Sequence, residues 1–195
     1  VAQGGACNVD VINFTPHGNG THTECIGHIT AEQQHITSAL PQGIMMARLL
    51  TISPEKDGGD LIIKKNQIPP LDNKSGLGAI IIRTLPNDDS KKNRDYSGTN
   101  PPYFEPETLQ YFKEKQIKHL LCDIPSVDRE DDGSKLLAHK AFFGVPDSPR
   151  LDATITELIY ANNEIEDGLY LLDIQIASFQ SDASPSRPLL YRLEI

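Results

Sequence analysis

The chain has 195 residues, of which 38% are hydrophobic and 23% charged, as is typical of a single globular domain spanning residues 1–195. Its net charge of −9 disfavours nucleic acid or an anionic membrane as a partner, because both bind basic surface. The apolar runs are too short to cross a bilayer, and an odd number of cysteines, three, favours a reducing compartment, so we expect a cytoplasmic location.

Short apolar runs between turn-forming residues predict the strands in the first half of the chain. The first is Val9–Phe14, which Thr15-Pro16 ends. The next two are Ile44–Ile52 and the strongly apolar Gly78–Thr84. The polar stretch Pro86–Pro102 contains several turn formers, which predicts a long exposed loop.

The second half of the chain predicts two helices and four more strands. A helix is expected over Pro106–Gln116, where acidic residues at the start and lysines near the end suit the helix dipole. A second is expected over Lys135–Phe143, capped by Ser134 and stopped by Gly144. The expected strands are His119–Ile124, Ala153–Tyr160, Gly168–Ala177 and Leu189–Ile195. This order of elements predicts an α/β or α+β domain with a mixed sheet and few helices.

The segment from His17 to His28 concentrates groups that bind first-row metal ions. In an extended chain, alternation places His22, Glu24 and His28 on one face. Imidazole and carboxylate groups are good ligands for such ions. A straight strand would separate His22 from His28 by about 20 Å, so we expect a bend near Gly27, where glycine has the conformational freedom to allow it.

Each of these residues also has an ordinary structural interpretation. A lone histidine on a strand is usually hydrogen-bonded or exposed, whereas three histidines and a glutamate within twelve residues favour a metal site. Glu157 shares its predicted strand face with apolar residues, so it either meets a cation or lies in water on an edge strand. His139 is expected on the inward face of the second helix, as a ligand or as a hydrogen-bonded core residue.

Together these segments resemble the cyclase family of metal-dependent hydrolases, which includes bacterial kynurenine formamidase and isatin hydrolase. The family pattern H-x-G-T-H-x-D-x-P-x-H resembles the stretch Gly20-Thr-His-Thr-Glu-Cys-Ile-Gly-His28. Further similar segments follow in order along nearly the whole chain: Ile81–Thr84, Pro106–Leu109, His119–Asp128, Ala138–Phe143 and Thr156–Leu158. The resemblance implies a swivelling β/β/α fold, one or two divalent ions (zinc or manganese) and a homodimer or homotetramer.

The resemblance also implies a role for each candidate residue. It implies five metal ligands, namely His17, His22, Glu24, His139 and Glu157. Glu24 would bridge from the first ion to a second one, and His28 would be the catalytic acid/base. The implied reaction is the hydrolysis of an amide, formamide or lactam C–N bond in a small-molecule substrate by water that the ion activates. His28 would pass a proton to the leaving amine.

The chain departs from the family pattern at three positions. His17 stands five residues before His22 rather than four, so either the turn bulges to keep His17 in place, or Asn19 or water substitutes for it. Glu24 replaces the usual Asp, which lengthens its reach by one methylene. Ile26 replaces the usual Pro.

These departures leave two other functional classes open. One is a metal-binding or small-molecule-binding protein that has lost the chemistry, and the other is a structural domain with incidental histidines. The chain also starts 16 residues before His17, fewer than the resemblance implies. We therefore expect that a segment preceding Val1 is missing.

Overall fold

The computed structural model describes residues 1–40, 43–72 and 76–193. The strands are β1 (His22–Cys25), β2 (Met45–Ile52), β3 (Glu55–Asp57), β4 (Asp60–Ile63), β5 (Leu77–Thr84), β6 (Tyr103–Phe104), β7 (His119–Cys122), β8 (Thr154–Glu157), β9 (Gly168–Ile176) and β10 (Ala183–Arg192). The helices are α1 (Ile36–Ala39), α2 (Pro106–Glu114) and α3 (Leu137–Phe143), and short 3-10 helices cover Ile26–His28, Lys65–Gln67 and Asp89–Asn93.

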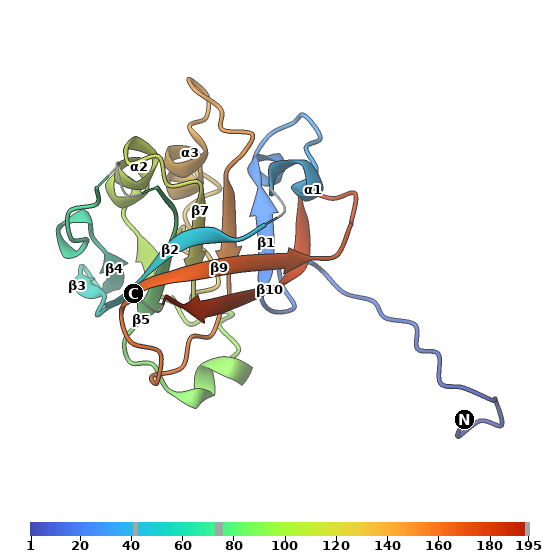
Figure 1. The fold of residues 1–195 in the computed structure, drawn as a ribbon. Helices are drawn as coiled ribbons and strands as arrows, with labels where there is room; N and C mark the ends of the chain where they lie inside the picture. Colours follow the sequence, from blue (N-terminus) through green and yellow to red (C-terminus); the bar gives the residue numbers. More distant parts are fainter. Residues whose placement is uncertain (41–42, 73–75, 194–195) are drawn as a thin grey trace.

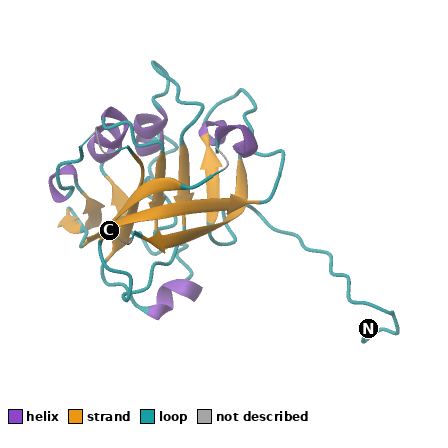
Figure 2. Ribbon diagram, viewed as in Figure 1, coloured by secondary structure: helices purple, strands orange, loops and turns teal. Residues whose placement is uncertain are grey.

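Seven of these strands close into a barrel in the order β1-β10-β9-β2-β5-β7-β8 (Figure 1). β2, β5, β7 and β8 run parallel to their neighbours in that series, whereas β1, β10 and β9 join the two ends through antiparallel pairs. A second sheet, β3-β4-β6, lies outside the barrel. Figure 2 shows strands at the centre and short helices around them, so the fold is the predicted mixed α/β class with few helices.

Strand β5 shows how the two halves of the core form. Its side chains alternate between the two faces of the sheet, and both faces are buried, as is common for a central parallel strand. Ile80 and Ile82 belong to the core that includes residues of α2 and α3, whereas Ala79 and Ile81 belong to the core inside the barrel. α2 and α3 lie together against one side of the barrel (Figure 1). The outer face of the barrel is therefore buried beneath these helices.

Several predicted elements are confirmed within two residues at each end: β2, β5, α2, β7 and β9. The predicted loop Pro86–Pro102 is also confirmed, and one short 3-10 helix interrupts it. Of the helices that the structure describes, none is both long and apolar enough to span a membrane.

The predicted strand Val9–Phe14 is wrong. Among the described residues no strand pairs with it, and most of its apolar side chains are exposed, with Val11 90% and Ile12 76% exposed. In Figure 1 the N-terminal segment leads away from the barrel. An apolar sequence makes a strand only where a partner supplies the hydrogen bonds, and this segment lacks one within the described chain.

Other boundaries moved because of contacts that are distant in sequence. Ser134 does not cap the second helix: the Asp128 carboxylate accepts hydrogen bonds from the first N–H groups of α3 at 2.7 and 3.1 Å. β8 ends at Glu157, since Leu158 takes a left-handed conformation with φ of 55°. β10 begins six residues earlier than predicted because its start pairs with β1, and Glu194 and Ile195 at the predicted end lie outside the described residues.

Candidate metal centre

The candidate site forms on the outer face of β1, where α3 covers the barrel. Strand alternation places His22 and Glu24 on that face, while Cys25 packs in the core inside the barrel. The antiparallel register of β1 with β8 sets His22 directly opposite Glu157. α3 brings His139 against the same face. Glu157 is buried within the barrel sheet, so the alternative of an exposed edge strand is wrong.

Glu24 lies at the centre of the site and is 0% exposed. Its Oε1 is 3.0 Å from Nε2 of His139. Its Oε2 is 3.0 Å from Nδ1 of His17 and 3.9 Å from Nε2 of His28. On the far side of the cluster, Nε2 of His22 is 3.4 Å from Oε2 of Glu157. The structure therefore brings together all six residues that the sequence singles out.

The bend that returns His28 to the site is a 3-10 helix directly after β1. The prediction of a bend near Gly27 is confirmed, but its physical reason is different. Gly27 does not occupy the left-handed region that favours glycine. A Cβ at this position would lie 2.5 Å from the carbonyl oxygen of Gln34 and 3.1 Å from Cβ of Asp182. The bend needs glycine because two other segments pass so close to it.

The extra residue before His22 is absorbed in a tight turn. The backbone N–H groups of Gly18 and Asn19 donate to the carbonyl oxygen of Thr15 at 3.1 and 3.2 Å. The side-chain oxygen of Asn19 accepts from the N–H of Thr15, so it is turned toward the backbone. Of the alternatives that the spacing left open, the structure therefore shows His17 itself facing Glu24.

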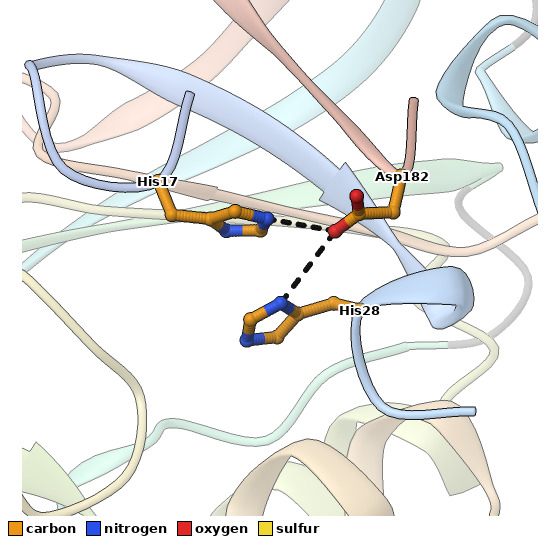
Figure 3. A group of neighbouring side chains, drawn as sticks. All are labelled: His17, His28 and Asp182. Carbon is orange, nitrogen blue, oxygen red and sulfur yellow. Dashed lines mark hydrogen bonds and ion pairs between the residues drawn. The ribbon is translucent and has the colours of Figure 1, made fainter. Parts of the chain in front are cut away.

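In each of the four histidines, one ring nitrogen faces Glu24 or Glu157, and the other, outer nitrogen has an oxygen partner of its own. Nδ1 of His22 is 2.9 Å from the carbonyl oxygen of Gly20, and Nδ1 of His139 is 2.6 Å from Oδ2 of Asp128. The other two histidines share Asp182, a residue on the loop before β10 (Figure 3). Such outer contacts orient an imidazole and set which nitrogen is free to bind a metal ion.

Sequence reasoning missed the two carboxylates that make these outer contacts. Asp128 ends the Pro-Ser-Val-Asp turn, and its position ten residues before Ala138 in α3 is the available signal for a helix-capping role. For Asp182 the sequence carries no local signal, because its place depends on the pairing of β10 with β1.

The charges of the cluster strongly shift the pKa values of three of its residues, His17, Glu24 and His139. Burial alone would lower the pKa of His17, but the Glu24 and Asp182 carboxylates outweigh it and raise that pKa to about 9. Burial opposes charge at His139 as well, yet Glu24, Asp128 and Glu157 raise its pKa well above the usual value. Burial would raise the pKa of Glu24, but the histidines around it hold that pKa well below its usual range. In the metal-free protein His17 and His139 therefore retain their protons, and a cation would compete for the places of those protons.

The buried polar atoms of the cluster fit a divalent cation. Four of them form no hydrogen bond with any residue that the structure describes, namely Nε2 of His22, Nε2 of His139 and both carboxylate oxygens of Glu24. In the metal-free protein these atoms face neighbouring charged groups as ion pairs, and a cation between them would replace the protons on the imidazole nitrogens. Imidazole nitrogen and carboxylate oxygen are donors that suit zinc or manganese.

The ligand atoms form overlapping groups, each of which could hold a cation; one of them is His17, His28 and Asp182. A second group is His17, His22 and Glu24, and a third is Glu24, His28 and His139; within each, the ligand atoms lie within 4.8 Å of one another. Glu24 belongs to the second and the third group, which suits a bridging carboxylate. The third group includes His28, so the structure allows this residue to be a ligand as well as an acid/base.

A cavity of about 880 Å³ gives access to one side of the site. It is lined by His17 and His28 and by the loops 93–97 and 128–134. The side chains of His17 and His28 are 28% and 31% exposed, whereas those of His22, Glu24, His139 and Glu157 are at most 5% exposed. A small molecule in the cavity would therefore meet His17 and His28 first.

Comparisons with known proteins give a matching family and several structures of similar fold. The cyclase family, described as "Putative cyclase", matches residues 5–129. No curated protein sequence matches the chain. The structure is similar to that of a potential metal-dependent hydrolase with cyclase activity (TM-score 0.70, 18% identity), with 94% of this chain and 82% of that chain covered.

Two further solved structures are similar over most of both chains. A predicted metal-dependent hydrolase from Bacillus stearothermophilus matches with a TM-score of 0.64 and 18% identity, covering 95% of this chain and 82% of the other. An isatin hydrolase bound to the product analogue thioisatinate matches with a TM-score of 0.61 and 14% identity, covering 91% and 72%. At these identities the likeness concerns the fold.

Proposed function

Because the chain belongs to the cyclase family, we propose that it is a metal-dependent hydrolase that cleaves an amide, formamide or lactam C–N bond in a small-molecule substrate. The observation that carries this proposal is the set of buried nitrogen and oxygen atoms of His22, Glu24 and His139, which form no hydrogen bond within the described chain and gather around Glu24. Of the three similar structures described above, two are named metal-dependent hydrolases and one an isatin hydrolase, which supports the class of reaction.

The proposed ligands of one or two zinc or manganese ions are those that the sequence indicated: His17, His22, Glu24, His139 and Glu157. Glu157 is prepared for this role by the backbone. Its Oε1 accepts a hydrogen bond from the N–H of Val127 at 2.9 Å, which leaves Oε2 facing His22. Glu24 receives no such bond on either oxygen and is free to contact both ligand groups to which it belongs.

When bound, a divalent ion supplies a more acidic water molecule and a Lewis acid that polarises a carbonyl group. His28 then carries the proton to the leaving amine, a role for which imidazole is the side chain most often used. It lines the cavity, and its Nδ1 faces Asp182 while its Nε2 faces Glu24. The buried side of the cluster excludes water, which strengthens the electrostatic interactions within it.

The test combines metal analysis with a substrate screen. Protein purified without chelator is expected to hold about one or two equivalents of zinc or manganese and to hydrolyse at least one member of a panel of formamides, lactams and cyclic imides. Protein without a bound divalent ion would contradict the metal centre. Protein that binds the ion and hydrolyses no member of the panel would instead be the alternative, a metal-binding or small-molecule-binding protein.

The role of His28 is tested by His28→Ala, with His35→Ala as the control at a half-buried histidine outside the cluster. His28→Ala is expected to retain the metal and to lower kcat about 10²- to 10⁴-fold. Unchanged hydrolysis would refute the acid/base role. Loss of metal would reassign His28 to the ligands.

The homodimer or homotetramer implied by the family resemblance remains part of the proposal, and analytical ultracentrifugation measures the oligomeric state.

A further inference from the structure

Asp182 lies between two histidines that come from opposite ends of the His17–His28 segment (Figure 3). Its Oδ2 is 2.7 Å from Nε2 of His17 and 3.6 Å from Nδ1 of His28. Its other oxygen, Oδ1, accepts a hydrogen bond from the Ser181 hydroxyl at 3.1 Å. One oxygen is thus held by a neighbouring residue, and the second faces both rings.

Two features of the fold put Asp182 at this place, the backbone pairing at the start of β10 and the absence of a side chain at Gly27. Its carbonyl oxygen accepts a hydrogen bond from the N–H of Cys25 at 2.9 Å, and the next residue, Ala183, is paired with Glu24. Gly27 has no side chain where a Cβ would lie 3.1 Å from Cβ of Asp182. Backbone pairing therefore fixes Asp182 against β1, and the glycine lets it approach.

The two rings are arranged alike although they use opposite nitrogens. His17 turns Nε2 to Asp182 and Nδ1 to Glu24, while His28 turns Nδ1 to Asp182 and Nε2 to Glu24. In each case the nitrogen away from Asp182 faces the centre of the cluster. A single carboxylate on the outer side therefore selects which nitrogen of both rings is available inside.

We infer that Asp182 is a positioning residue that accepts hydrogen bonds from the outer nitrogens of His17 and His28 and so aims their inner nitrogens at the ion site around Glu24. The contact to His28 has to shorten to below about 3.2 Å to become a hydrogen bond. The inference rests on the proposed metal-dependent function. It adds a residue to the site that stands more than 150 positions away from both rings in the sequence.

The first experiment needs no metal and uses the full chain with ¹⁵N-labelled histidine and a chelator. In the wild type, NMR is expected to show a hydrogen-bonded His17 Nε2–H proton shifted far downfield and protected from exchange with solvent. Asp182→Ala should remove this signal, and Asp182→Asn should retain a weaker one, because its amide oxygen still accepts. A signal that is unchanged in Asp182→Ala would overturn the inference, whether or not the protein binds metal.

The second experiment measures Zn²⁺ affinity by competition with a chromophoric chelator. Asp182→Ala is expected to weaken binding about 10- to 100-fold, as is usual on loss of an outer partner of a metal ligand, with Asp182→Asn between it and the wild type. The control is Asp173→Asn on β9, where the carboxylate accepts from Gln175. If the wild type binds no ion, the proposed function fails and the first experiment alone decides.

Two results would overturn the positioning role while leaving the proposed function intact. One is equal Zn²⁺ affinity in the wild type and Asp182→Ala. The other is a structure of the Zn²⁺-loaded protein in which a carboxylate oxygen of Asp182 lies within about 2.2 Å of the ion, because Asp182 would then be a direct ligand.

Discussion

The replacement of Gly27 by alanine is the change for which the structure specifies the clash most directly. The added Cβ would lie 2.5 Å from the carbonyl oxygen of Gln34, and a carbon at that distance from a backbone oxygen overlaps it strongly. The second contact, 3.1 Å to Cβ of Asp182, is also tight. Neither partner can relieve the overlap by a rotamer change, because the first is backbone and the second is a Cβ. Either the 3-10 helix that carries His28 or the segment around Gln34 must move.

The expected cost follows from the usual penalty of overpacking. An extra methyl group in a tightly packed place costs about 1–3 kcal/mol, and contact with backbone puts Gly27→Ala near the upper end, about 2–3 kcal/mol. For a chain of this size, each kcal/mol lowers Tm by about 2–4 °C, so we expect a decrease of roughly 4–12 °C. The φ angle of Gly27 adds no penalty, because it lies outside the left-handed region.

The assay is thermal unfolding followed by circular dichroism, with a chelator present so that metal binding does not contribute. Gly18→Ala is the matched control, because the nearest atoms to its Cβ belong to the Thr15 side chain, at 3.9 and 4.0 Å. It should leave Tm unchanged or raise it slightly by restricting the unfolded chain. Displacement of His28 or Asp182 should also weaken Zn²⁺ binding in Gly27→Ala but not in Gly18→Ala.

Equal Tm values for the two alanine variants would refute this reasoning. Such a result would mean that the loop at Gln34 moves aside without cost. The close approach would then not explain why glycine stands at the bend.

Three further predictions concern the cluster itself. Asp128→Ala should lower the free energy of unfolding by about 2–4 kcal/mol, because two N–H groups of α3 and the His139 ring lose their acceptor. Urea denaturation measures this loss, with Asp131→Ala at an exposed position as the control. A loss no larger than that of the control would contradict the prediction. The metal-free protein should lose stability as pH rises from 6.5 to 9, because the pKa of His17 is about 9 in the folded protein and 6.5 in the unfolded chain. Protonated His17 therefore stabilises the fold fully below pH 6.5, and this contribution is lost as pH rises through 9. Unfolding measured at a series of pH values should show a smaller loss of stability in His17→Gln. Zn²⁺ at about 100 times its Kd should stabilise the protein by about 2.7 kcal/mol, or roughly 5–11 °C in Tm, and differential scanning fluorimetry should show no such shift for Glu24→Gln.

Local sequence was sufficient for elements that local physics controls. The apolar run of β5 and the charge order along α2 predict these elements within two residues, because strand burial and the helix dipole act over a few residues. The types and spacing of residues in His17–His28 likewise indicate the chemistry of the site, because imidazole and carboxylate are the groups that bind such ions.

Local sequence failed where a partner distant in the chain decides the outcome. Val9–Phe14 has the composition of a strand, but no strand in the described part of the chain pairs with it, so it lies exposed. Ser134 is a good helix cap by type, yet the carboxylate of Asp128 takes that role through the loop that precedes α3. Gly27 was assigned to the bend for its flexibility, whereas the fold requires it for the close approach of Gln34 and Asp182.

The sequence by itself therefore determined which residues of the site are chemically able to hold a cation, and in which elements most of them lie. Only the tertiary structure decided that they converge. The register of β1 with β8 sets His22 against Glu157, and its pairing with β10 delivers Asp182 to two histidines. Register and packing depend on contacts across more than a hundred residues, and no window of local sequence contains both partners of such a contact.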